Sequence, residues 1–137
     1  MSDLERARLL LTEGGYTCVL CKDNSVHTST YRGVRPLMDL LDTDVSGFSA
    51  ADKVVGKATA LLYCLLGIKE LYACIISDAA AEVLQRRNIP VQWDRRVAFI
   101  KNREGTGRCP MEMATEGISD PADAPAAIRN KLKELQG

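Results

Sequence analysis

A long run of apolar residues at helical spacing dominates the middle of the chain. Between Val54 and Leu66 the apolar residues recur three and four positions apart, which predicts a helix. Ser49 is a favourable N-cap, and Asp52 three residues later completes a capping-box pattern, so we expect the helix to begin at Ser49 and to end at Gly67. Because it is apolar around much of its circumference, it should lie centrally, packed on a sheet.

Strand patterns flank this helix on both sides. A hairpin is predicted over residues 16–22 and 25–30, with an Asp-Asn turn between them. The unbroken apolar run LYACII at 71–76 is typical of a strand buried on both faces. A capped helix over 79–87 separates it from a strand at 97–100, which the preceding VQW could begin. This strand–helix–strand unit predicts a parallel pair of strands.

Shorter helical patterns complete the chain. They lie at 4–11, where two glycines follow, at 37–41, where a proline precedes, and at 126–135. The order of elements predicts an α/β fold, a three-layer α/β/α sandwich with a mixed sheet. We expect a single domain over the whole chain, with its core in residues 3–115 and a helical tail at 120–137.

Composition and charge exclude some classes of partner. The 137 residues carry 18 basic and 18 acidic side chains, so the formal net charge is zero, and we expect no nucleic-acid partner. The longest apolar run, 58–68, is far short of a membrane span, and the N-terminus lacks the features of a secretory signal. We therefore expect a cytoplasmic protein with no membrane partner. A net charge near zero is also compatible with a homodimer.

The cysteines favour free thiols over a disulfide or metal framework. There are five, an odd number in a chain expected in the cytosol. Cys18 and Cys21 form a CxxC, but in a strand residues three apart point to opposite faces, so their sulfurs should diverge. We interpret both as buried structural thiols. The only histidine, His27, lacks a partner motif, and we expect no metal and no cofactor.

Two lysines mark the first candidate site. In the predicted helix Lys53 and Lys57 share one stripe, beside a stripe with Asp52 and Gly56. An interior glycine costs about 1 kcal/mol relative to alanine, and lysines near a helix start are poorly placed for the dipole. The ordinary interpretation is a capped helix with solvated lysines and a glycine at a packing contact. The functional one is an anion site at the helix N-terminus.

A glycine-containing loop marks the second candidate site. Gly105 and Gly107 permit backbone conformations in which amides can cradle phosphate. Cys109 should stand at a helix start beside a basic residue, an environment that favours thiolate. The alternative is a plain glycine loop before a capped helix, since the spacing matches no phosphate-loop or dinucleotide fingerprint. The residues expected to line this wall are Asn102, Arg103, Gly105, Gly107, Cys109 and Glu112.

Three segments together resemble a known family. They read FSAADKVVGKATALL, LYACIISDAAAEVL and IKNREGTGRCPMEM, and they are similar to the bacterial and archaeal domain of unknown function 1893, whose structural relatives have the cytidine-deaminase-like fold. The resemblance spans nearly all of residues 3–115. It implies a three-layer α/β/α fold with a pocket at the start of the helix that carries Asp52. It implies no particular activity.

The resemblance also provides a test of zinc chemistry. Zinc deaminases carry a His or Cys and a catalytic Glu at one helix start and a PCxxC at a second. Here the corresponding strings are Ala-Ala-Asp-Lys at 50–53 and Ser-Asp-Ala-Ala-Ala-Glu at 77–82, with no sulfur or imidazole in either. Without three protein ligands no zinc-bound water can be activated, so we do not expect a zinc deaminase.

The same topology predicts where a ligand would bind. Both helix starts should flank one end of the sheet, which would bring together Asp52, Lys53, Ser77 and Asp78. We expect a small anionic ligand, such as a nucleotide. Whether the chain is an enzyme stays open; in an enzyme Lys53 would stabilise negative charge, and Asp52 or Glu112 would move protons. The alternatives are a non-catalytic dimeric interaction module and a thiol-based redox protein that uses Cys109.

Overall fold

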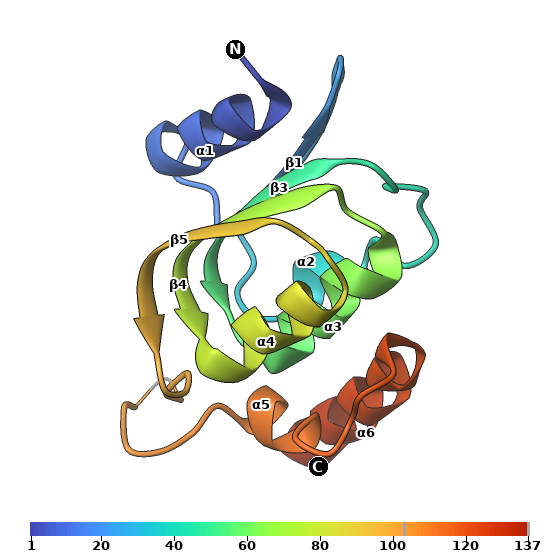
Figure 1. Cartoon of the computed structure of the whole chain (residues 1–137). Helices are drawn as coiled ribbons and strands as arrows, with labels where there is room; N and C mark the ends of the chain where they lie inside the picture. The colour runs from blue at the N-terminus through green and yellow to red at the C-terminus, as the bar shows by residue number, and fades with distance from the viewer. Residues whose placement is uncertain (103, 137) are drawn as a thin grey trace.

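A five-stranded mixed sheet forms the centre of the molecule (Figure 1). The computed structural model describes residues 1–102 and 104–136. The strands lie in the order β2-β1-β3-β4-β5. Their bounds are β1 Cys18–Lys22, β2 Ser25–Ser29, β3 Ser49–Val55, β4 Glu70–Ser77 and β5 Val91–Val97. β1 runs antiparallel to both β2 and β3, whereas β3, β4 and β5 are parallel, so the mixed sheet is confirmed.

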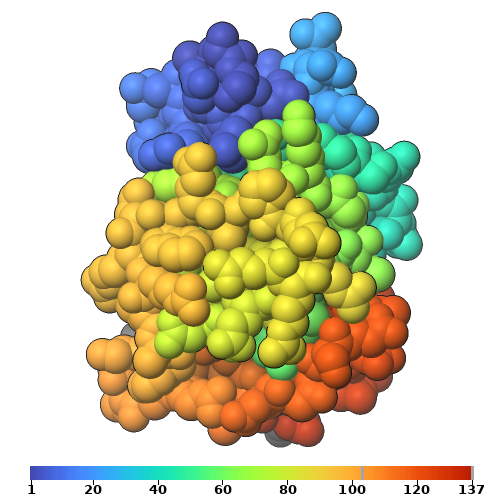
Figure 2. All heavy atoms as spheres, viewed as in Figure 1, coloured from blue at the N-terminus to red at the C-terminus, as the bar shows by residue number. Residues whose placement is uncertain are grey.

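Helices cover both faces of this sheet, which confirms the α/β/α sandwich. One face carries α1 (Asp3–Glu13), and the other carries α2 (Arg35–Met38), α3 (Lys57–Leu66) and α4 (Asp78–Arg86). The C-terminal elements pack on the outer side of α3: α5 (Pro110–Ala114), the 3₁₀ helix η1 (Pro121–Asp123) and α6 (Ala124–Gln136). In Figure 2 they form an orange and red band below the yellow-green α4. Among the described residues, every helix is too short or too polar to cross a membrane.

The single helix predicted from Ser49 to Gly67 is wrong in its first half. Residues Ser49–Val55 form β3, and α3 begins only at Lys57. The apolar spacing of the segment fits either structure, and pairing decides between them, because β3 lies between β1 and β4 and exchanges backbone hydrogen bonds with both. Gly56 is the N-cap of α3, and Gly67 ends the helix in the left-handed conformation with φ 72°, as predicted.

The last strand is also displaced from its prediction. The strand expected at 97–100 occupies Val91–Val97, and the Asp-Arg-Arg sequence expected to form a bulge or turn lies inside it. This strand is an edge of the sheet and pairs only with β4 among the described strands, so its charged side chains can reach solvent. The helix expected at 37–41 is shorter and earlier, at Arg35–Met38.

The central helix α3 is buried on nearly every side. All residues from Ala58 to Tyr63 are buried, because the sheet covers one side and the C-terminal segment covers the other. Ala124 and Ile128 are fully buried in the same core cluster. The helix is apolar on nearly all sides because both the sheet and the C-terminal segment pack against it, and of these two contacts only the one with the sheet was expected.

Candidate functional site

Two helices begin side by side at the end of the sheet where the parallel strands finish, which we call the carboxyl end of the sheet. Val55 at the end of β3 pairs with Ile76 near the end of β4, and α3 and α4 follow these strands at once. Lys57, Ser77 and Asp78 therefore lie together at the carboxyl end of the sheet, where open α/β sheets bind ligands. Both helix starts flank one end of the sheet as predicted, but of the four residues expected to meet there only Ser77 and Asp78 do, and Lys57 stands in place of Asp52 and Lys53.

Glu112, from the second candidate segment, also lies at the carboxyl end of the sheet. The residue is 4% exposed; its Oε2 accepts the Ile100 N–H at 2.7 Å and its Oε1 accepts the Lys57 N–H at 3.4 Å. A Cβ on Gly56 would stand 3.0 Å from Glu112 Cγ, so glycine makes the close approach possible. The two stretches that the sequence singled out do meet, and the protein's own carboxylate occupies the start of α3.

The start of α4 is likewise satisfied from within the chain. The Ser77 hydroxyl accepts the Ala80 N–H at 3.2 Å as an N-cap. Asp78 Oδ1 accepts a hydrogen bond from Arg96 Nε at 2.6 Å. Both residues that we expected to bind a ligand thus have structural partners.

Asp52 and Lys53 do not lie at the carboxyl end of the sheet, because they belong to the middle of β3. Asp52 pairs with Cys18 on one side and Ala73 on the other, inside the sheet, and the residue is 8% exposed. Lys53 is exposed, its backbone N–H donates to the Thr17 carbonyl, and strand alternation directs its side chain to the face opposite Asp52. The expectation that both line the same wall as Lys57 is therefore wrong.

Asp52 forms a buried hydrogen-bonded cluster with Tyr63 and Cys18. Tyr63 Oη donates to Asp52 Oδ2 at 2.6 Å, and Cys18 Sγ lies 3.3 Å from the same hydroxyl. Burial raises the pKa of Asp52 to about 7, against which the hydrogen bond from Tyr63 acts. Burial, followed by the nearby Asp52 charge, raises the pKa of both Cys18 and Tyr63. Cys18 and Tyr63 therefore keep their protons at neutral pH, Asp52 titrates near it, and all three lie inside the core.

The CxxC sulfurs diverge as predicted. Cys18 belongs to the core cluster around α3, whereas Cys21 packs in the cluster beneath α1. Both thiols are free and buried. Among residues 1–102 and 104–136, no three His, Cys, Asp or Glu side chains form a group that could hold a metal. The observed first turn of α3, Lys57–Ala60, also contains none of these residues.

The glycine loop closes on itself. Asn102 N–H donates to the Gly107 carbonyl at 2.8 Å, and its side-chain Oδ1 accepts the Thr106 N–H at 3.0 Å. Gly105 takes the left-handed conformation with φ 71°, which explains the glycine. Arg103, expected on this wall, lies outside the described residues. Cys109 is half-buried and is the N-cap residue of α5; its redox role stays a prediction.

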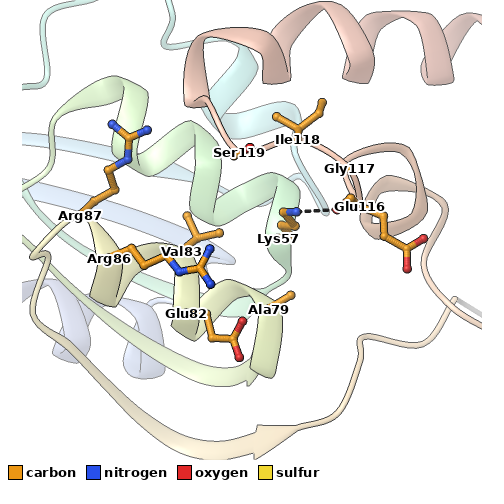
Figure 3. A pocket seen from close by; sticks show the side chains of 10 residues that line it. All are labelled: Lys57, Ala79, Glu82, Val83, Arg86, Arg87, Glu116, Gly117, Ile118 and Ser119. Atoms are coloured by element: carbon orange, nitrogen blue, oxygen red, sulfur yellow. Dashed lines mark hydrogen bonds between the residues drawn. The ribbon is translucent and has the colours of Figure 1, made fainter.

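A groove of about 410 Å³ opens beside the carboxyl end of the sheet, between α4 and the turn at 116–119 (Figure 3). One wall is the face of α4 that residues three and four apart create. The other wall is the turn that follows α5. The lining consists of Lys57, Ala79, Glu82, Val83, Arg86, Arg87, Glu116, Gly117, Ile118 and Ser119. Helical spacing could have revealed the α4 face, but nothing in the sequence indicated which turn lies opposite.

The charges around this groove are unequally paired. Lys57 Nζ donates to the Glu116 carbonyl at 2.7 Å, which fixes the ammonium at the inner wall, as Figure 3 shows. The Glu116 carboxylate pairs with Arg108 at 3.2 Å. Within the described part of the chain, neither Arg86 nor Arg87 has a carboxylate within 4 Å. Two guanidinium groups thus remain available, with Glu82 as the acid beside them.

Comparison with known proteins gives a family and a fold. The family model described as a domain of unknown function, DUF1893, matches residues 6–132. The crystal structure of a DUF1893 family protein from Thermotoga maritima superposes with a TM-score of 0.86 at 22% sequence identity. The superposition covers 96% of this chain and 91% of that chain. Comparison with curated proteins found no match. Because the family model covers almost the whole chain, this protein belongs to the DUF1893 family.

Proposed function

We propose that this DUF1893 domain binds a small anionic ligand, such as a nucleotide or another phosphorylated metabolite, in the groove between α4 and residues 116–119. The observation that carries the proposal is the set of three cations at this groove, Lys57, Arg86 and Arg87. Both guanidinium groups lack a carboxylate partner among the described residues. Arginine is suited to this role because its planar fork matches the oxygens of phosphate and carboxylate groups.

The size and composition of the groove agree with a ligand of this class. Its volume of about 410 Å³ lies within the roughly 300–1,000 Å³ of small-molecule sites. Val83 and Ile118 supply apolar surface, and Ser119 supplies a hydroxyl. Glu82 would repel a bare anion and accept hydrogen bonds from a ligand that also carries donors. A nucleotide has both kinds of group, with phosphate oxygens for the arginines and ring or sugar donors for the carboxylate.

The contacts at the starts of α3 and α4 favour binding of the anion by side chains and not by helix-start amides. Glu112 already accepts the Lys57 N–H, and the Ser77 hydroxyl caps α4. These contacts leave the Lys57 ammonium, which lies in the groove, to act with the arginines. The proposal covers binding only; whether the chain is an enzyme stays open, and the cytidine-deaminase-like fold stays what the family resemblance implies.

Isothermal titration with AMP, ADP and inorganic pyrophosphate tests the proposal. We expect at least one of these probes to bind the wild-type protein. The double variant Arg86→Ala/Arg87→Ala should lose affinity by roughly 10–100-fold, because a hydrogen bond to a charged group contributes about 1.5–3 kcal/mol. Arg129→Ala, at an exposed position on α6 outside the groove, is the matched control. Equal affinity in the double variant and the control, or no binding of any probe, would disprove the proposal.

A further inference from the structure

The two edges of the sheet differ in how they are protected. β2 and β5 are the outer strands. β5 contains Asp94, Arg95 and Arg96, charged residues of the kind that keep an edge from pairing with another strand. β2, with the sequence SVHTS, contains no acidic or basic residue other than its histidine, and no proline or glycine. Its pattern of partly and fully exposed side chains shows an open edge.

The hairpin geometry shows which backbone groups of β2 are free. The turn Asp23-Asn24 joins β1 and β2, and Lys22 pairs with Ser25 across it. In a two-residue hairpin that flanking pair is hydrogen-bonded, and such pairs alternate along an antiparallel ladder. His27 therefore directs its N–H and C=O toward Leu20 of β1. The same groups of Val26 and Thr28 point outward, away from β1.

We propose that a second copy of this chain docks on this edge, with β2 pairing antiparallel to β2 of its neighbour about a two-fold axis at His27. The two sheets would then form one continuous ten-stranded sheet. This register sets Val26 opposite Thr28 of the second copy, and the reverse. The four outward groups on each strand then form about four hydrogen bonds in total. It also pairs β-branched side chains across the interface, an arrangement that stabilises sheets.

A hollow beside this edge supports the same occupant. It measures about 170 Å³ and lies between β2 and α2, lined among others by Cys18, His27 and Tyr31. Val26 is 42% exposed and Tyr31 is 51% exposed, so large apolar side chains flank the strand. Val26 lies on the α1 side of the sheet, opposite Cys21, and the hollow lies on the His27 side, so a neighbouring strand on β2 would cover part of each face at this edge. An isologous pairing needs a surface complementary to itself, which an uncharged strand centred on one residue provides.

Sedimentation velocity over a range of protein concentrations tests the proposal. The wild-type chain should sediment as a dimer whose fraction rises with concentration. The double variant Val26→Lys/Thr28→Lys should remain monomeric, because the charges would face each other across the axis. Gln92→Lys adds charge to the opposite edge, on β5, and should leave the dimer intact. Circular dichroism and thermal unfolding of both variants confirm that the fold is kept.

Amide hydrogen exchange provides a second measurement that depends on the register. In the dimer the Val26 and Thr28 amides should be protected, and in the double variant both positions should exchange rapidly, while the His27 amide stays protected in each. A wild-type chain that is monomeric throughout would overturn the proposal. So would a dimer that persists in the double variant, since another surface would then hold it. A monomer that binds an added peptide strand at β2 would assign the edge to a different partner.

Discussion

The substitution Asp52→Asn tests whether a buried carboxyl makes this protein less stable as the pH rises. Asp52 accepts a hydrogen bond from Tyr63 at 2.6 Å and lies in the core. Asparagine has nearly the same shape as the protonated acid and retains one acceptor oxygen. Its amide can donate to the Tyr63 oxygen, which can in turn donate to Cys18. The variant therefore removes the ionisation and leaves the packing intact.

The sign of the effect follows from proton linkage. Burial raises the pKa of Asp52 from 3.8 in the unfolded chain to about 7 in the folded one. Below pH 3.8 both states are protonated, and the group contributes its full stability. Between these two pKa values the unfolded state releases its proton while the folded state retains it, so stability falls as the pH rises.

The magnitude follows from the same pKa difference. Each pKa unit corresponds to about 1.4 kcal/mol, and the shift to about 7 from 3.8 thus removes about 4 kcal/mol of unfolding free energy by pH 8. At pH 5 the loss is only about 1–2 kcal/mol. Relative to the wild type, Asp52→Asn should therefore gain about 3 kcal/mol between pH 5 and 8, a large share of the stability of an ordinary domain.

Urea denaturation of both proteins at several pH values measures the effect. The other carboxyl groups contribute equally to each curve, so the difference between the two proteins isolates Asp52. Asp44→Asn is a suitable control, because hydrogen bonds from Ser46 lower the pKa of that exposed carboxyl. Its removal should change the pH dependence in the opposite direction. Parallel curves for the wild type and Asp52→Asn would refute the argument and show that the carboxylate is stabilised within the core.

Three further substitutions test the contacts that hold α3 in place, at its start, at its end and against α6. Glu112→Ala should lower the unfolding free energy by about 1–3 kcal/mol, since the Ile100 and Lys57 amides lose their acceptor; an unchanged urea midpoint would contradict this. Gly67→Ala places a side chain at φ 72° and should cost about 1–2 kcal/mol, measured by thermal unfolding against the exposed, open Gly117→Ala. Ile128→Ala should cost about 2–5 kcal/mol if α6 belongs to the core, whereas exposed Ala126→Gly should cost less.

The sequence predicted the elements that local pattern determines. The run LYACII predicted a buried strand, and it is the middle of β4. Ser77 and Gly67 mark helix ends through their own side-chain and backbone chemistry, so both boundaries were accessible. The divergence of the CxxC sulfurs is confirmed as well, because strand alternation alone separates Cys18 from Cys21.

The error at residues 49–55 arose where pattern and pairing disagree. Asp52 and Gly56 fit one helical stripe by spacing, but strand β3 is formed by its neighbours on both sides, which are distant in sequence. As a consequence, Asp52 and Lys53, which were expected at a helix start beside the ligand, lie within a strand. The opposite wall of the groove was beyond prediction for a similar reason, because the position of residues 116–119 depends on how α5 and α6 pack on α3.

The position of Glu112 has a consequence for how an anion could be bound at all. A helix start with free amides attracts anions, but here Gly56 allows a carboxylate from α5 to reach the first amide of α3. A ligand at that amide would have to displace a buried, hydrogen-bonded group, with a cost similar to the 1–3 kcal/mol of an unsatisfied partner. The guanidinium groups of Arg86 and Arg87, which have no carboxylate partner in the part of the chain that the structure describes, carry no such cost. An anion should therefore prefer the groove, and Glu112→Gln, which retains the acceptor oxygen, should leave its affinity nearly unchanged while Arg86→Ala weakens it.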